Sequence, residues 1–194
     1  MTSIWVTSIG RSLDAAMDML ASAVSACPSG LWESPMWPVE VPEPSHQFLD
    51  SQWKPVSDPV ERERLVQRWV ERRSTPWSVA WHALEVFDYD LNGEMSPWMP
   101  PVPFAGHPHW RDLPSLAAAW SPDQLLGYVT YCREQARSAL AGMSEEKAAT
   151  PLPRSHRYAG QPYASNVTGL VVHTTEHAAQ IRQFITCSGL APRE

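Results

Sequence analysis

The stretch NVTGLVVHTTEHAAQIRQFITC, residues 166–187, carries the strongest signals for both the fold and a functional site. Apolar or small side chains recur in it at three- and four-residue steps, the pattern of one buried helix face: Val167, Leu170, Val171, Thr174, Ala178, Ile181 and Ile185. A polar strip runs beside this face and consists of His173, His177 and Gln180. A buried polar strip is costly unless its groups are paired or ligated, so these histidines need a partner.

The rest of the chain alternates between proline-poor and proline-rich segments. Its 19 prolines crowd into residues 28–59, 97–114 and 150–162. The proline-poor segments have apolar residues at helical spacing, and they predict helices over about 3–27, 75–92 and 121–142 and a shorter one over 59–72. Three of these begin with a capping residue followed by proline, at Asp58-Pro59, Thr75-Pro76 and Ser121-Pro122. Asn92-Gly93 and Gly142 are expected at helix ends.

This pattern predicts an all-α protein, a four-helix bundle with long proline-rich connections. No segment shows the two-residue alternation of a strand, and no internal repeat is present. The length suits a single domain, residues 1–194, in which 28–72 is an insertion between the first two long helices. We expect the Trp and Phe residues of 28–57 to cover one end of the bundle.

Composition excludes several classes of function. The net charge of −6 is spread along the chain, and no basic stripe with interleaved aromatic residues indicates nucleic-acid binding. No stretch approaches the roughly 20 apolar residues of a membrane span, and the N-terminus lacks the features of a secretory signal. Three cysteines, Cys27, Cys132 and Cys187, are too far apart to suggest a disulfide framework or a metal site. A cytoplasmic, reduced location is therefore expected.

The histidines of two helices are candidate metal ligands. His173 and His177 lie four residues apart, which places them about 40° apart around a helix and about 6 Å apart along it. His82 lies in the middle of a mostly apolar helix. Three neutral imidazoles with an open position form the ligand set of a catalytic metal ion. The alternatives are a surface pair at 173 and 177 and a hydrogen-bonded core histidine at 82.

The sequence also resembles the DinB-like superfamily of metal-binding four-helix bundles. The resemblance covers most of the chain from Pro76 onward. It rests on these motifs: Thr75-Pro76-Trp77 before Trp81-His82-Ala83-Leu84, Phe87-Asp88-Tyr89-Asp90-Leu91, Trp120-Ser121-Pro122-Asp123, and His173-Thr174-Thr175-Glu176-His177-Ala178-Ala179-Gln180-Ile181. The superfamily includes bacillithiol and mycothiol transferases and mycothiol-dependent maleylpyruvate isomerase. The 28–57 segment is longer than the resemblance leads us to expect.

The resemblance implies one divalent metal ion on His82, His173 and His177. It also implies an enzyme that combines a small-molecule substrate with a low-molecular-weight thiol, and a possible homodimer. Imidazole suits zinc, nickel, copper and iron alike, and we expect zinc or nickel. Tyr89 and Gln180, each one helical repeat from a ligand, are expected to orient a ligand or a bound water.

Other interpretations of the same sequence remain open. Arg154 and Arg157 are either ligands for substrate carboxylates or, as we expect, solvated loop charges. His173 to His177 also spells the HxxEH of inverted zinc peptidases, with Glu176 as the base, although that residue points away from both histidines. A metal-stabilised stress or interaction protein without catalysis fits equally. His107-Pro108-His109 is expected at the surface, and four tryptophans are expected in packing and pocket lining: Trp77, Trp81, Trp98 and Trp110.

Overall fold

The computed structural model describes residues 4–43, 48, 54–92 and 98–189. Over these residues the regular secondary structure is entirely helical, which confirms the prediction of an all-α protein. The α-helices are α1 (Ile4–Ala26), α2 (Pro59–Arg72), α3 (Pro76–Asn92), α4 (Pro122–Ala141), α5 (Glu145–Ala149) and α6 (Tyr163–Cys187). Three short 3-10 helices lie in the connections: η1 (Ser29–Leu31), η2 (Phe104–Gly106) and η3 (Trp110–Ser115).

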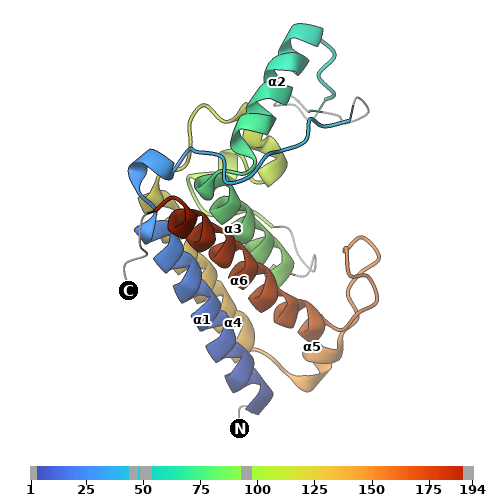
Figure 1. The fold of residues 1–194 in the computed structure, drawn as a ribbon. Coiled ribbons are helices and arrows are strands. Elements are labelled where there is room, and N and C mark those ends of the chain that lie inside the picture. Colours follow the sequence, from blue (N-terminus) through green and yellow to red (C-terminus); the bar gives the residue numbers. More distant parts are fainter. Residues whose placement is uncertain (1–3, 44–47, 49–53, 93–97, 190–194) are drawn as a thin grey trace.

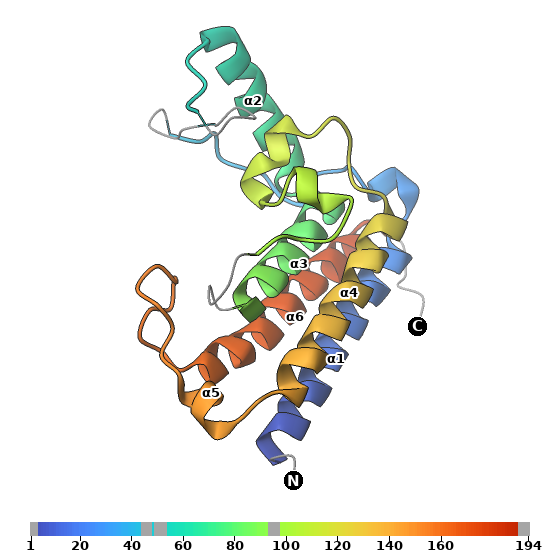
Figure 2. The ribbon, with the colours of Figure 1, turned by 180° about the vertical axis from the view of Figure 1, so that it is seen from behind.

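The four long helices, α1, α3, α4 and α6, lie side by side as a bundle (Figure 1). Both α1 and α3 pack against α4 and α6, so α1 and α3 occupy opposite corners. The chain direction of α1 and α6 is opposite to that of α3 and α4, as Figure 2 shows from behind. Ion pairs of Arg133 with Asp18 and of Arg137 with Asp14 lie along the antiparallel contact of α1 with α4.

The apolar stripes predicted for the long helices face the interior of this bundle. Val171 and Cys27 are half-buried, whereas the other stripe residues are buried. The buried members are Ile9, Leu13, Ala16, Met17, Leu20 and Val24 of α1, Leu125, Val129, Cys132, Ala136 and Leu140 of α4, and Val167, Leu170, Thr174, Ala178, Ile181 and Ile185 of α6. Burial of one face of each helix is what holds the helices together.

The parallel arrangement of α3 and α4 explains the long connection between them. The chain leaves the 17-residue α3 at the end opposite to the start of α4, so it must return over about 26 Å. On this return, η3 packs against both α2 and α3. The connection thereby brings loop residues to the N-terminal half of α3, where His82 lies.

The predicted helix starts are present. The Asp58 carboxylate accepts hydrogen bonds from the first backbone N–H groups of α2, and Ser121 and Gln124 form a reciprocal capping box at α4. The end of α3 at Asn92 agrees with the prediction, whereas Gly93 lies outside the described residues. Polar caps before proline therefore marked real helix starts in this chain.

The start of α6 differs slightly from the prediction, whereas its end at Cys187 agrees with it. It begins at Tyr163, three residues before the expected start at residue 166. Pro162 precedes it with a φ of −60° and an extended ψ, so the proline restricts the backbone on entry to the helix. Gly189 adopts a positive φ of 76° just beyond the last turn, as a helix exit requires.

A second layer formed by α2 and η3 lies beyond the end of the bundle at which α3 begins (Figure 1). The indole N–H of Trp32 donates to the Trp120 carbonyl over 2.9 Å, so this residue covers the bundle end as expected. Phe48 instead packs edge-on against Trp69 of α2, with ring centroids 6.2 Å apart. Within the described residues, no helix is both long and apolar enough to cross a lipid bilayer.

Candidate metal centre

Three histidines from two antiparallel helices meet inside the bundle. His82 is on α3, and His173 and His177 are one turn apart on α6. One nitrogen atom from each ring lies within 4.8 Å of the other two. The ring of His82 is 5.2 Å from that of His173 and 5.1 Å from that of His177, measured between centroids. The structure therefore brings together the three residues that the sequence predicts as ligands.

The spacing of these nitrogens fits a single metal ion. The Nε2 atoms of His173 and His177 are 3.1 Å apart. An ion about 2.0–2.1 Å from each nitrogen in tetrahedral geometry holds its ligands about 3.3 Å apart.

Gln180 fixes the orientation of one ligand. The Nδ1–H of His177 donates to Oε1 of Gln180 over 2.8 Å. In the neutral ring this leaves the lone pair on Nε2, the atom that faces His173. Gln180 is one of the two residues predicted to orient the ligands. It contacts His177 and selects the tautomer whose Nε2 can bind a metal ion.

Burial keeps two of the imidazoles neutral. It lowers the pKa of His82 to about 3, and the neighbouring His177 and His173 lower it further in the same direction. Burial and then His177 lower the pKa of His173 to about 4. A neutral imidazole is the form that binds metal ions, so both rings are in the ligand form at neutral pH.

The three candidate ligand histidines also have unsatisfied polar atoms. The Nδ1 atoms of His82 and His173 are buried and have no hydrogen-bond partner among the described residues. Without a cation, the facing Nε2 atoms of His173 and His177 are satisfied only if one of them carries a proton and donates it to the other over 3.1 Å. The chemistry of these residues therefore fits a divalent ion that imidazole can bind.

An aromatic residue of the long connection covers the site. The ring of Trp110, in η3, lies 4.3 Å from the ring of His82 between centroids. Trp110 also packs against Trp69 of α2, and the Arg73 guanidinium lies 5.1 Å from its ring centroid. Trp77 and Trp81 are fully buried in α3 and stack on each other, in agreement with the expected packing role.

The expectation that His109 is a surface residue is wrong. It is half-buried, and its Nδ1 lies 3.1 Å from Oε1 of the buried Glu85. Glu85 is on α3, three residues after His82, so this imidazole–carboxylate pair lies about one helical turn along α3 from His82. The only sign of this pair in the sequence was Glu85, an acidic residue within a mostly apolar helix. The path of the loop that brings His109 to it was not predictable.

Tyr89 lies two turns beyond His82 on α3. Its ring contacts those of Trp98 and His109, with centroids 5.2 and 6.1 Å apart. These contacts attach it to the long connection that carries Trp110. Its expected role in orienting a ligand or a bound water stays a prediction.

The two loop arginines differ. Arg154 is exposed, as expected of a solvated loop charge. Arg157 instead forms an ion pair with the buried carboxylate of Asp90 on α3, a contact that the sequence did not predict. The Arg157 charge is also among the smaller causes that lower the pKa of His82 and of His173, after burial and the neighbouring histidines.

Glu176 and the cysteines stand apart from the triad. Glu176, the base of the alternative peptidase hypothesis, is exposed. All three cysteines are free thiols; Cys132 is buried, Cys27 half-buried and Cys187 exposed. Burial raises the pKa of Cys27 to about 11, so this thiol stays protonated near neutral pH.

Comparisons of this chain with protein-family models, with curated proteins and with solved structures find no match. The resemblance to the DinB-like superfamily accordingly rests on the sequence motifs alone.

Proposed function

We propose that His82, His173 and His177 bind one divalent transition-metal ion, zinc or nickel, in a bundle of the DinB-like type. We further propose that the protein is an enzyme that joins a low-molecular-weight thiol to a small organic electrophile. The observation that carries the proposal is the convergence of three imidazoles from α3 and α6, with their nitrogens within 4.8 Å of one another. The resemblance to thiol transferases and isomerases supports the reaction class.

The three-nitrogen set leaves coordination positions for a substrate. When bound, a divalent ion supplies positive charge that lowers the pKa of a thiol or a water molecule toward neutrality. Gln180 holds the His177 ring so that Nε2 points to the centre of the triad. Trp110 covers one face of His82 and limits the access of water from that side.

We assign the proton that the thiol loses to His109. Its ring is held by the Glu85 carboxylate one turn from His82, and a carboxylate-paired imidazole is a common proton acceptor in enzymes. The thiol sulfur would then bond to the electrophilic carbon, the leaving group (chloride for an aryl chloride) would depart with its electron pair, and the thiol proton would pass to His109. His109 thus has a proposed role in the reaction without being a metal ligand.

Metal analysis tests the first part of the proposal. Protein purified without a histidine tag should carry close to one transition-metal ion per chain, and His177→Ala should lose most of it. The matched control is His107→Ala, because His107 is a half-buried loop histidine outside the triad. Equal and low metal content in the wild type and in His177→Ala would refute the metal site.

Activity assays test the second part. Metal-loaded protein should accelerate the reaction of a thiol such as cysteine methyl ester with an activated aryl chloride, and His177→Ala should not. Full metal content without thiol consumption would favour a metal-stabilised bundle without catalysis. Ester hydrolysis without a thiol would instead favour the hydrolase alternative.

A further inference from the structure

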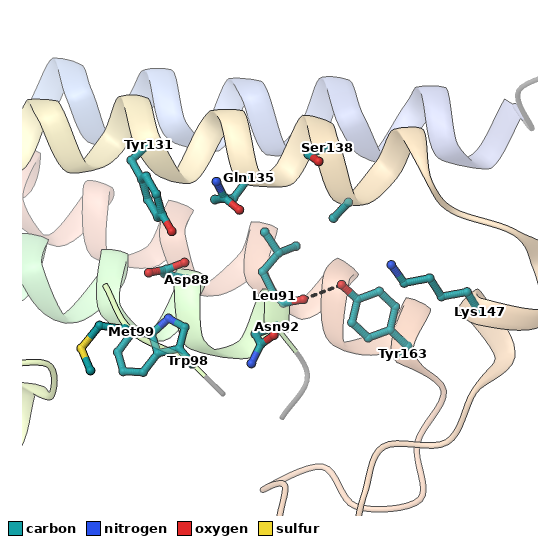
Figure 3. Close-up of a pocket in the computed structure, with 11 residues that line it drawn as sticks. Asp88, Leu91, Asn92, Trp98, Met99, Tyr131, Gln135, Ser138, Lys147 and Tyr163 are labelled. Atoms are coloured by element: carbon teal, nitrogen blue, oxygen red, sulfur yellow. Dashed lines mark hydrogen bonds between the residues drawn. The ribbon is translucent and has the colours of Figure 1, made fainter. Parts of the chain in front are cut away.

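A cavity separate from the histidine triad lies at the C-terminal end of α3. It has a volume of about 410 Å³, and Figure 3 shows it between α3 and α4, closed at one end by residues of α5 and of the start of α6. None of the three histidines lines it. This volume is within the range of about 300–1,000 Å³ that is usual for small-molecule sites. The cavity is thus large enough for a ligand of its own.

One end of the cavity carries a buried negative group. Asp88 of α3 is only 4% exposed, and the Tyr128 hydroxyl donates to its Oδ2 over 3.0 Å. Burial raises the pKa of Asp88 to about 6, so its charge is poorly solvated but still present at neutral pH. Trp98 and Tyr131 lie on either side of this carboxylate (Figure 3). Aromatic rings beside a buried carboxylate favour a cation.

The other end of the cavity carries a positive group. Lys147 of α5 is half-buried, and its Nζ lies 5.7 Å from the ring centroid of Tyr163. Tyr163 is held in place because its hydroxyl donates to the Leu91 carbonyl, the bond drawn in Figure 3. Ser138 of α4 adds a hydroxyl at this end. An anionic group is favoured here.

We propose that this cavity binds a small zwitterion, an amino-carboxylate whose ammonium group lies at Asp88 and whose carboxylate lies at Lys147. The opposite charges at the two ends define the orientation of the ligand. Its ammonium would give the buried Asp88 carboxylate a cationic partner at its own end of the cavity, opposite to Lys147. The cavity shares no lining residue with the histidine triad, and Trp98 separates it from His109, with ring centroids 5.3 Å apart.

Calorimetric titration tests the proposal with three probes: 5-aminopentanoate, pentylamine and pentanoate. The amino acid should bind at least tenfold more tightly than either single-charge analogue, because only it carries both an ammonium and a carboxylate. Failure of 5-aminopentanoate to bind at millimolar concentration would overturn the proposal. Equal affinity for 5-aminopentanoate and pentylamine would also overturn it, since Lys147 would then contribute nothing.

Variants of both ends sharpen this test. Asp88→Asn keeps the size and the bond from Tyr128 but removes the charge, so binding should weaken about tenfold or more while the fold is retained. The matched control is Glu134→Gln, an exposed acid on α4 that does not line the cavity and should leave the affinity unchanged. Ser138→Phe should block binding by filling space, because Ser138 is exposed and tolerates a larger side chain. Unchanged affinity in Asp88→Asn, or in Ser138→Phe, would refute the assignment.

Discussion

Replacement of Gln180 by alanine should weaken metal binding by about 10- to 100-fold, the usual effect of losing a residue that orients a metal ligand. In this protein Gln180 accepts the Nδ1–H of His177 over 2.8 Å. The corresponding Nδ1 atoms of His82 and His173 have no partner among the described residues. The whole orienting effect seen here therefore depends on one hydrogen bond, and its loss should cost about 1.4–2.7 kcal/mol of binding free energy.

The same geometry predicts a rescue. Gln180→Glu restores the acceptor and adds a charge that stabilises the Nδ1–H form of His177, so it should bind the ion at least as tightly as the wild type. Gln183→Ala is the matched control, because Gln183 lies one turn away on α6 and is exposed. Affinity is measured by competition with a chromogenic chelator for zinc and for nickel at one fixed pH. Equal affinities of Gln180→Ala, Gln183→Ala and the wild type would refute the role of this hydrogen bond.

Further predictions concern pH, an ion pair and proton transfer. Burial lowers the pKa of His82 to about 3 and that of His173 to about 4, whereas the unfolded chain takes up these protons near pH 6.5. Metal-free protein should therefore lose stability as the pH falls below about 6.5, by on the order of 2 kcal/mol per histidine at about pH 5. Urea unfolding at each pH with a chelator measures this loss, and a flat profile would contradict it. Arg157→Gln should destabilise the fold by roughly 1–3 kcal/mol, because it removes the guanidinium from the buried Asp90 carboxylate and leaves His156, whose Nε2 lies 3.6 Å away, beside it. Arg154→Gln should stay within about 0.5 kcal/mol in the same assay. His109→Gln should lower kcat for thiol transfer about 100-fold and flatten its pH profile without changing the metal content, and a change in metal content alone would assign His109 a structural role.

Local patterns in the sequence determined the helices and the pairing of two of the three candidate metal ligands, His173 and His177. Proline at first helical positions, with polar caps at α2 and α4, marked helix starts, and three- and four-residue spacing identified the buried faces. His173 and His177 share a face of α6 because 3.6 residues per turn place positions four apart on one side. These features depend on neighbours in the chain, so the sequence alone was sufficient to predict them.

Contacts between distant segments were decided only by the tertiary structure. The alignment of α3 against α6 brings His82 to the histidine pair, and the return of the long connection brings Trp110 and His109 to α3. The sequence suggested His82 as a ligand but could not show this alignment, and it misjudged His109 as exposed. Loop paths depend on the packing of whole helices, which no local pattern encodes.

The buried charges and the cavity lined by Asp88 show the same division. The sequence shows that Asp88 and Asp90 lie two residues apart near the end of a helix, a position that would suit two solvated acids. In the structure Asp90 pairs with Arg157 of a distant loop, and Asp88 lines a cavity between two helices. Side-chain burial and charge pairing depend on how segments far apart in the chain pack together. The charged ends of this cavity could therefore be identified only in the folded molecule.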